Sequence, residues 1–354
     1  MERNRLAVVA AVLATIGALS AFDLFLARTQ NRETSAEARQ DYEAGTRLLA
    51  ENRPGDAIDL LRKAHALDRS DLRYSLELAS ALSADGRPEE AQAMLGDVLE
   101  TSPNNGEANL LEARLMVRQD RISDATSYYH RAIFGSWNAA PGRGVQVRLE
   151  LARLLASRGQ SRELLAELLP IETEARDLPT RKQVAHLFLV AGAPARAAAA
   201  YRALMRDDPR DRSDYNGLGD AELASGNFRS AASAFQSGGA GDRARLAEDL
   251  AALDPTPRRL SAGEKLARAT RVLEVARKAA CPPASDDSLE KAADELLAKK
   301  IRTATNELAE ARLTLAEQIW DQRAANCAAP ADARLKLIMS KLEGPPSGSP
   351  ATPY

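Results

Sequence analysis

The sequence contains few of the residues on which several classes of protein depend. Of its 354 residues two are cysteine, three are histidine and 4% are aromatic. Two cysteines exclude a disulfide-dense scaffold, a four-cysteine zinc site and an iron–sulfur cluster. The 48 basic and 50 acidic residues leave a formal net charge of −2, which excludes a globally basic nucleic-acid-binding protein. We therefore expect no nucleic-acid partner and no cofactor.

Motifs typical of enzymes are also missing. The sequence has no phosphate-binding glycine loop followed by Lys-Ser/Thr, no nucleophile elbow, no zinc-protease motif and no Cys-x-x-Cys pair. None of the three histidines, His65, His130 and His186, has a second ligand at metal-binding spacing. We therefore predict that they lie on the surface or in a groove. The sequence thus predicts no catalytic residues, no metal site and no small-molecule substrate.

Alanine, leucine, arginine and glutamate are abundant, as is typical of a helical protein. Apolar residues make up 45% of the chain and charged residues 28%, which argues against bulk disorder. The length is enough for two to three domains with a sizeable core. We predict an all-α fold.

Residues 6–27 form a long apolar run whose only charge is Asp23. As a helix this run would be about 33 Å long, enough to cross a hydrocarbon core of about 30 Å. The run predicts a transmembrane helix between a short tail, residues 1–5, and a linker, residues 28–37. The alternative is a cleaved signal peptide, with Arg3 and Arg5 before the apolar run. Arginines flank both ends of the run, so the positive-inside rule favours neither orientation.

A pattern of small and large residues recurs every 34 residues between positions 38 and 245. Glycines and prolines follow the expected helices, where a left-handed residue or a helix stop is favoured. A short insertion, residues 140–144, interrupts the register. The expected units are 38–71, 72–105, 106–139, 145–178, 178–211 and 212–245, with the small residues Gly45, Ala79, Ala113, Ala152, Ala185 and Gly219 in the first helix of each.

This pattern resembles the tetratricopeptide repeat, and the alternative is an unrelated alanine-rich helical bundle. The resemblance implies an α-solenoid of about six helical hairpins, here a superhelix over residues 38–254. It also implies a concave groove lined by the first helix of each hairpin. The residues at groove positions are Arg39, Tyr42, Arg73, Arg114, Arg118, Arg153, Lys182, His186, Asn216 and Asp220.

These groove residues are mostly basic, which predicts an acidic peptide or protein surface as the partner. The alternative is a chance enrichment, since arginine is frequent throughout this chain. The family's clamp for C-terminal carboxylates needs lysine and asparagine in successive units. Tyr42, Thr46, Glu77 and Leu111 occupy those places, so we do not expect that type of ligand.

The repeat signature ends near Asp254, and residues 258–342 predict a C-terminal helical domain or cap. Ser261 and Glu264 form a capping-box pattern at its start. If the chain folds back near residues 299–302, Cys281 and Cys327 meet at one end of three helices and can form a disulfide. The alternative is two unrelated thiols. The Pro/Ser-rich residues 343–354 predict a disordered tail.

Together these features predict a protein-binding scaffold anchored in a bacterial inner membrane by a single span, with its soluble region in the periplasm. Resemblance to anchored tetratricopeptide proteins implies a role in the assembly or maturation of a cell-envelope complex. Two alternatives stay open at this point. One is a periplasmic chaperone of the holdase type, and the other is a cytoplasm-facing adaptor for a membrane machine.

Overall fold

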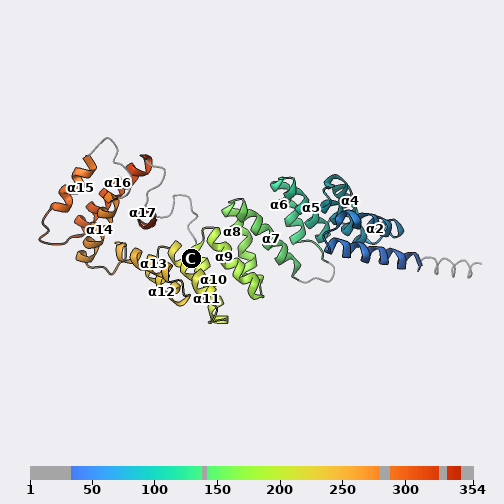
Figure 1. Cartoon of the computed structure of the whole chain (residues 1–354), viewed down its shortest axis with the longest axis horizontal. Coiled ribbons are helices and arrows are strands. Elements are labelled where there is room, and N and C mark those ends of the chain that lie inside the picture. Colours follow the sequence, from blue (N-terminus) through green and yellow to red (C-terminus); the bar gives the residue numbers. More distant parts are fainter. Residues whose placement is uncertain (1–32, 138–141, 279–287, 327–332, 344–354) are drawn as a thin grey trace, which may run out of the picture. The chain divides into compact units, whose positions relative to one another are not determined.

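The computed structural model describes residues 33–137, 142–278, 288–326 and 333–343. Their secondary structure is helical throughout, apart from one isolated β-bridge between Asn105 and Ser136, which confirms the all-α prediction (Figure 1). The chain divides into two compact units, Met1–Leu154 and Leu155–Tyr354, and the division falls inside α7. Unit 1 contains α1 (33–50), α2 (Pro54–Leu67), α3 (Leu72–Ala84), α4 (Pro88–Thr101), α5 (Gly106–Arg118), α6 (Ile122–Ile133) and most of α7 (Arg143–Ser157).

Unit 2 contains α8 to α17. Its helices are α8 (Ser161–Glu174), α9 (Leu178–Val190), α10 (Pro194–Asp207), α11 (Arg212–Ala224), α12 (Phe228–Ser237), α13 (Gly241–Leu253), α14 (Ala262–Lys278), α15 (Ser288–Ala298), α16 (Asn306–Asn326) and α17 (Ala333–Glu343). Within each unit neighbouring helices form the hairpins that the 34-residue period predicted (Figure 1).

One left-handed residue follows the first helix of every predicted hairpin. Four of these residues are the glycines that the sequence pointed to, for example Gly86 with φ +78°. Asn52 and Asp120, with φ of 60° and 57°, take the equivalent place in the first and third hairpins. Asparagine and aspartate tolerate this conformation better than other side chains. The turn therefore repeats six times among the described residues, at Asn52, Gly86, Asp120, Gly159, Gly192 and Gly226.

Small residues allow the two helices of a hairpin to approach closely. A Cβ atom on Gly45 of α1 would lie 2.7 Å from Cγ of Leu61 on α2, which leaves no room for a side chain. Leu61 is fully buried and packs with Leu78 and Leu82 of α3 in one apolar cluster. Side-chain caps begin four of the first helices, at Asp71, Asn105, Asp177 and Asp211.

In unit 2 the last repeat and the C-terminal helices share one core. Phe228 of α12 and Leu250 of α13 belong to the same buried cluster as residues of α14, α15, α16 and α17. Lys341 of α17 donates to the backbone oxygen of Gly226 at 2.8 Å and pairs with the buried Asp254 at 2.6 Å. These contacts join α17 to residues on the N-terminal side of residue 258, where the sequence predicts the start of the C-terminal domain.

The C-terminal helices fold back as expected between residues 298 and 306, where α15 ends and α16 begins. Arg277 of α14 pairs with Asp294 of α15 at 2.5 Å, and Lys265 of α14 pairs with Glu310 of α16 at 3.4 Å. The capping box is confirmed, because the Ser261 backbone N–H donates to Glu264 at 2.9 Å and the Glu264 backbone N–H donates to Oγ of Ser261 at 3.2 Å.

Three predicted features lie outside the described residues: the apolar segment 6–27, both cysteines and nearly all of the tail 343–354. No described helix combines the length and the apolar character needed to cross a membrane. The anchor and the disulfide therefore stay predictions.

The disulfide can be tested by counting thiols. We expect protein taken from its native compartment and unfolded in denaturant to show no reactive thiol before reduction and two after it. A disulfide closing a loop of this length would stabilise the chain by about 4 kcal/mol. Two reactive thiols before reduction would contradict the pairing of Cys281 with Cys327.

Candidate functional site

A hollow of about 740 Å³ lies in unit 1, on the side formed by the first helices of its hairpins. Its lining includes Tyr42 of α1, Arg73 and Glu77 of α3, Glu107 of α5, Trp137 and Arg143. Leu72 and Leu76 add apolar surface. Its size is that of a small-molecule or short-peptide site. The hollow brings together two residues that the sequence placed in the groove, Tyr42 and Arg73.

The segment before the insertion forms one wall of this hollow. The N–H of Ser136 donates to the oxygen of Asn104 at 2.7 Å, and the N–H of Gly106 donates to the oxygen of Ser136 at 3.0 Å. The Trp137 indole lies against Gly106, where a Cβ atom would be 2.4 Å from the ring. Its Nε1–H donates to the oxygen of Ala132 at 2.9 Å. Trp137 was not among the predicted site residues, although a tryptophan next to a break in the repeat register was a usable signal.

Arg73 and Tyr42 also line the hollow. The Arg73 guanidinium binds both carboxylate oxygens of Asp71, and the hydrogen bond from Arg73 lowers the pKa of Asp71. The rings of Tyr42 and Tyr74 are 5.1 Å apart. Burial raises the pKa of Tyr42, and the nearby charge of Glu77 adds to this effect. Arg73 is therefore already paired inside the protein.

Glu77 and Glu107 are the other charged groups of the α3 and α5 helices that line the hollow. Burial raises the pKa of Glu77, and the neighbouring charge of Glu107 raises it further. Among the residues that the structure describes, no Lys, Arg or His nitrogen lies within 4 Å of either carboxylate. The hollow thus holds two carboxylates without a salt-bridge partner.

Other predicted groove residues in unit 1 are paired with groups of the protein itself. The Arg114 guanidinium donates to both carboxylate oxygens of Glu150, at 2.8 and 2.7 Å, and thereby joins α5 to α7. Arg118 donates to the backbone oxygen of Ser83. Arg39 pairs with Glu43 at 3.6 Å on α1. Most of the side chains that suggested a basic binding face are therefore paired with groups of the protein itself.

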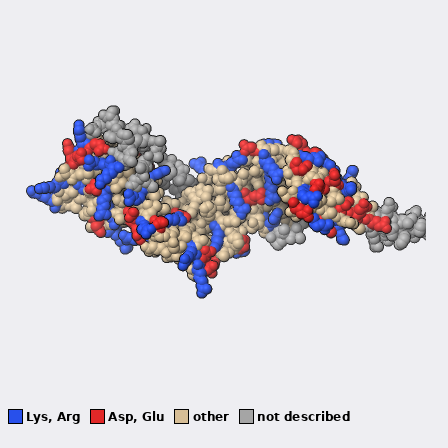
Figure 2. Space-filling model, viewed as in Figure 1, with Lys and Arg blue, Asp and Glu red and all other residues tan. Residues whose placement is uncertain are grey.

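The remaining predicted groove residues belong to unit 2, except Arg153, which is exposed on α7. Lys182 contacts Asp211 and also lies 3.7 Å from Asp214. Asp220 pairs with Arg243, and Asn216 donates to the oxygen of Gly238 at 3.3 Å. His186 is exposed. Basic and acidic side chains also alternate over the visible face of the molecule (Figure 2).

The Arg114–Glu150 pair gives a prediction for stability. Burial alone would raise the pKa of Glu150, but hydrogen bonds from Arg114 and Tyr129 outweigh it and lower that pKa below 4.5. Arg114→Met should therefore destabilise unit 1 by about 1–2 kcal/mol at pH 7, a value reduced for the partial exposure of both side chains.

The loss should shrink as the pH falls through the folded-state pKa of Glu150, because protonation removes the stabilising charge. Urea unfolding of Arg114→Met and of the double variant Arg114→Met/Glu150→Gln between pH 3 and pH 7 measures this. An equal loss of stability at pH 3 and at pH 7 for Arg114→Met would contradict a stabilising contribution from the charge of Glu150. The double variant should recover part of the loss at pH 7.

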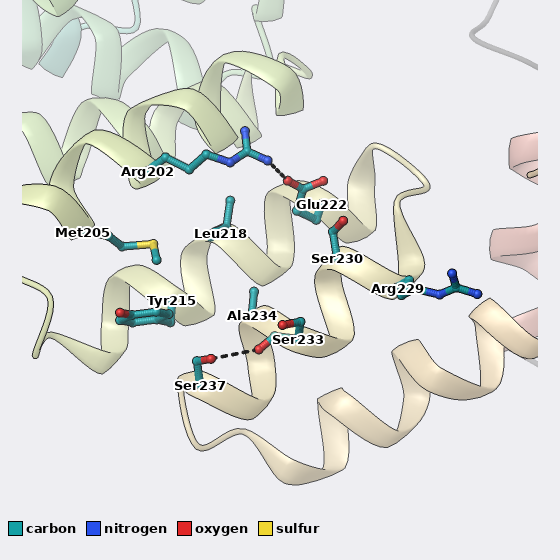
Figure 3. Close-up of a pocket in the computed structure, with 10 residues that line it drawn as sticks. All are labelled: Arg202, Met205, Tyr215, Leu218, Glu222, Arg229, Ser230, Ser233, Ala234 and Ser237. Atoms are coloured by element: carbon teal, nitrogen blue, oxygen red, sulfur yellow. Dashed lines mark hydrogen bonds and ion pairs between the residues drawn. The ribbon is translucent and has the colours of Figure 1, made fainter.

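Unit 2 has a second, smaller pocket of about 420 Å³ between α10, α11 and α12 (Figure 3). Met205, Tyr215 and Leu218 form its apolar part. Arg202 of α10 reaches the buried Glu222 of α11, which also accepts a hydrogen bond from Asn227 at 2.8 Å. None of the predicted groove residues lines this pocket. Its charged pair is internally satisfied, so the unit 1 hollow is the stronger candidate for a binding site.

No group of three His, Cys, Asp or Glu residues suited to a metal ion occurs in the described part of the chain. The described residues therefore offer no candidate metal centre. The lining of the hollow provides charged, hydrogen-bonding and apolar groups for recognition.

The family model of the tetratricopeptide repeat matches residues 48–98 and 82–133, which include α3 and α5, two of the helices that line the hollow. No curated protein sequence gives a significant match. Among solved structures, the type IV pilus biogenesis factor PilW is 17% identical to this chain, with a TM-score of 0.42 over 59% of this chain and 96% of that one. A tetratricopeptide repeat protein from Parabacteroides merdae is 13% identical with a TM-score of 0.40 over 79% and 99%.

The TPR2AB domain of yeast Sti1, in its pHSP90 complex, is 16% identical with a TM-score of 0.31 over 82% and 99% of the two chains. Identities this low, with TM-scores below 0.5, say nothing about the partner of this chain.

Proposed function

We propose that this chain, which belongs to the tetratricopeptide repeat family, is a scaffold that binds another polypeptide in the hollow of unit 1. The observation that supports this best is the hollow itself, of about 740 Å³, in which Tyr42, Leu72 and Trp137 combine with unpaired carboxylates. Binding sites typically combine apolar and aromatic surface with a few polar groups that fix orientation. The repeats supply no catalytic cluster among the described residues, so binding is the activity that fits.

We further propose that residues 6–27 anchor the chain in a bacterial inner membrane and that the repeats face the periplasm. The support is the apolar run of 22 residues with its single charge at Asp23. Anchoring would confine the hollow to a layer near the membrane and so raise the effective concentration of a membrane-bound partner. This arrangement suits assistance to the assembly or maturation of a cell-envelope complex.

Co-purification of the full chain from its own cells tests the scaffold function. Asn104 lines the hollow and has an exposed side chain, so Asn104→Trp should obstruct it without disturbing the core. Asp59 is exposed on α2 and lines no part of the hollow, so Asp59→Trp is the matched control. We expect one stable complex that Asn104→Trp removes and Asp59→Trp preserves.

The same experiment separates the competing functions. Several unrelated proteins captured at low yield, together with suppression of aggregation in vitro, would indicate a holdase chaperone instead. A complex that survives Asn104→Trp unchanged would move the binding site away from the hollow.

A further inference from the structure

Resting on the proposed function, we infer that the hollow of unit 1 takes an extended polypeptide segment that carries a lysine or arginine, whose cation lies between Glu77 and Glu107. This reverses the charge of the ligand that the sequence suggested. The inference depends on which charged groups of the hollow are paired within the protein and which are not.

The two carboxylates come from neighbouring first helices and point to one space. Glu77 lies on α3 and Glu107 lies in the first turn of α5, and both line the hollow. Glu77 is half-buried, and its raised pKa reports burial together with repulsion from Glu107. Two like charges in a partly desolvated site repel each other. A cation placed between them would relieve that repulsion and satisfy both groups.

The guanidinium groups of the hollow do not fill this role. Arg73 donates to Asp71 through its Nε and one of its two Nη atoms, and Arg143 lies over the Trp137 ring, 5.6 Å from its centre. Arg73 and its partner Asp71 neutralise each other. This leaves the carboxylates of Glu77 and Glu107 against the single guanidinium of Arg143, an excess of one negative charge. Charge complementarity therefore favours a positively charged ligand.

The surroundings also fit a long basic side chain. Leu72 and Leu76 offer apolar surface for the methylene stem of lysine or arginine. The Tyr42 ring lies among the same lining residues, where an aromatic face can attract a cation. Asn104 lies at the same hollow and carries an amide group able to bond the backbone of an extended segment, whereas the side-chain oxygen of Asn105 caps α5. The volume of about 740 Å³ accommodates such a segment rather than a whole helix.

Selection from a phage-displayed library of random peptides, with the purified full chain in detergent as bait, tests the inference. We expect the selected peptides to be enriched in lysine and arginine. For synthetic copies of these peptides, Glu77→Gln/Glu107→Gln should weaken binding at least about tenfold, as expected for losing two charge-assisted contacts. Binding should also weaken as salt concentration rises.

The matched control is Glu89→Gln/Glu100→Gln, which removes the same two charges from exposed positions on α4, a helix that lines no part of the hollow. This control should leave binding within about twofold. Equal weakening by both double variants would overturn the inference, because it would show a general effect of net charge. Circular dichroism confirms that each variant keeps its helicity.

Asn104→Trp separates failure of this inference from failure of the proposed function. Selected peptides could lose binding to Asn104→Trp and still bind Glu77→Gln/Glu107→Gln. That result would overturn the inference of a basic ligand but keep the hollow as a binding site. Peptides that bind regardless of Asn104→Trp, or no selected peptide at all, would overturn both.

Discussion

Phe235→Ala should lower the free energy of unfolding of unit 2 by about 3–5 kcal/mol, the usual cost of truncating a buried phenylalanine. Phe235 is 0% exposed on α12, between Gly219 of α11 and the Arg243 guanidinium 4.1 Å from the ring centre. Because neighbouring hairpins stabilise one another in repeat proteins, the loss should spread to adjacent helices. Urea unfolding followed by circular dichroism measures it.

A double-mutant cycle with Gly219 makes this prediction specific. A Cβ atom on Gly219 would lie 2.4 Å from the Phe235 ring, so Gly219→Leu alone should destabilise by about 1–3 kcal/mol through overpacking. In the double variant Gly219→Leu/Phe235→Ala the new side chain fills the space left by the ring. The double variant should therefore lose less free energy of unfolding than the two single variants lose together.

Phe134→Ala is the matched control, since Phe134 is 78% exposed and should cost less than about 1 kcal/mol. Additive losses in the cycle, or a cost for Phe235→Ala no larger than that of Phe134→Ala, would contradict the packing described for α11 and α12.

Glu112→Leu should stabilise unit 1 by about 1–3 kcal/mol at pH 8 and by much less at pH 5. Glu112 is 3% exposed on α5, and its Oε2 atom has no hydrogen-bond partner. Burial raises its pKa from 4.5 to about 7. The equivalent positions of the second and fourth 34-residue repeats hold leucine, Leu78 and Leu151. An apolar side chain of this size therefore fits at this position of the repeat.

The direction of the pH dependence follows from this raised pKa. Between pH 4.5 and 7 the folded chain holds a proton on Glu112 that the unfolded chain has released, so rising pH favours unfolding. The stability of Glu112→Leu minus that of the natural chain should therefore grow across this range, as measured by urea unfolding at several pH values. A difference that is constant with pH, or that favours glutamate at pH 8, would show that the carboxyl is satisfied in solution.

The helical hairpins were predictable from the sequence because packing requires small residues at fixed spacing. Gly45 and Gly219 each lie against a large side chain of the partner helix, so the 34-residue pattern records a steric requirement directly. Asn52 and Asp120 were not recognised as turn residues, because their left-handed conformation is less strongly encoded than that of glycine. The shared core of α12 to α17 was also not predictable, since it depends on contacts between residues far apart in the sequence.

The site was predicted only in part, for an electrostatic reason. Tyr42 and Arg73 do line the hollow, but a count of basic residues cannot tell a charge that faces a ligand from one paired within the fold. Arg114 of the third repeat binds Glu150 of the fourth repeat, a pairing that is visible only in three dimensions. Glu77 was named only at a place of the carboxylate clamp and Glu107 was not singled out, although both line the hollow.

Photocrosslinking from the hollow in living cells tests the central claim most directly. A photoreactive amino acid at Asn104, which lines the hollow, is compared with the same group at Asp59 on α2. The account predicts a discrete adduct with another polypeptide from position 104 and none from position 59. Adducts of equal yield from both positions, or an adduct from position 59 alone, would contradict it.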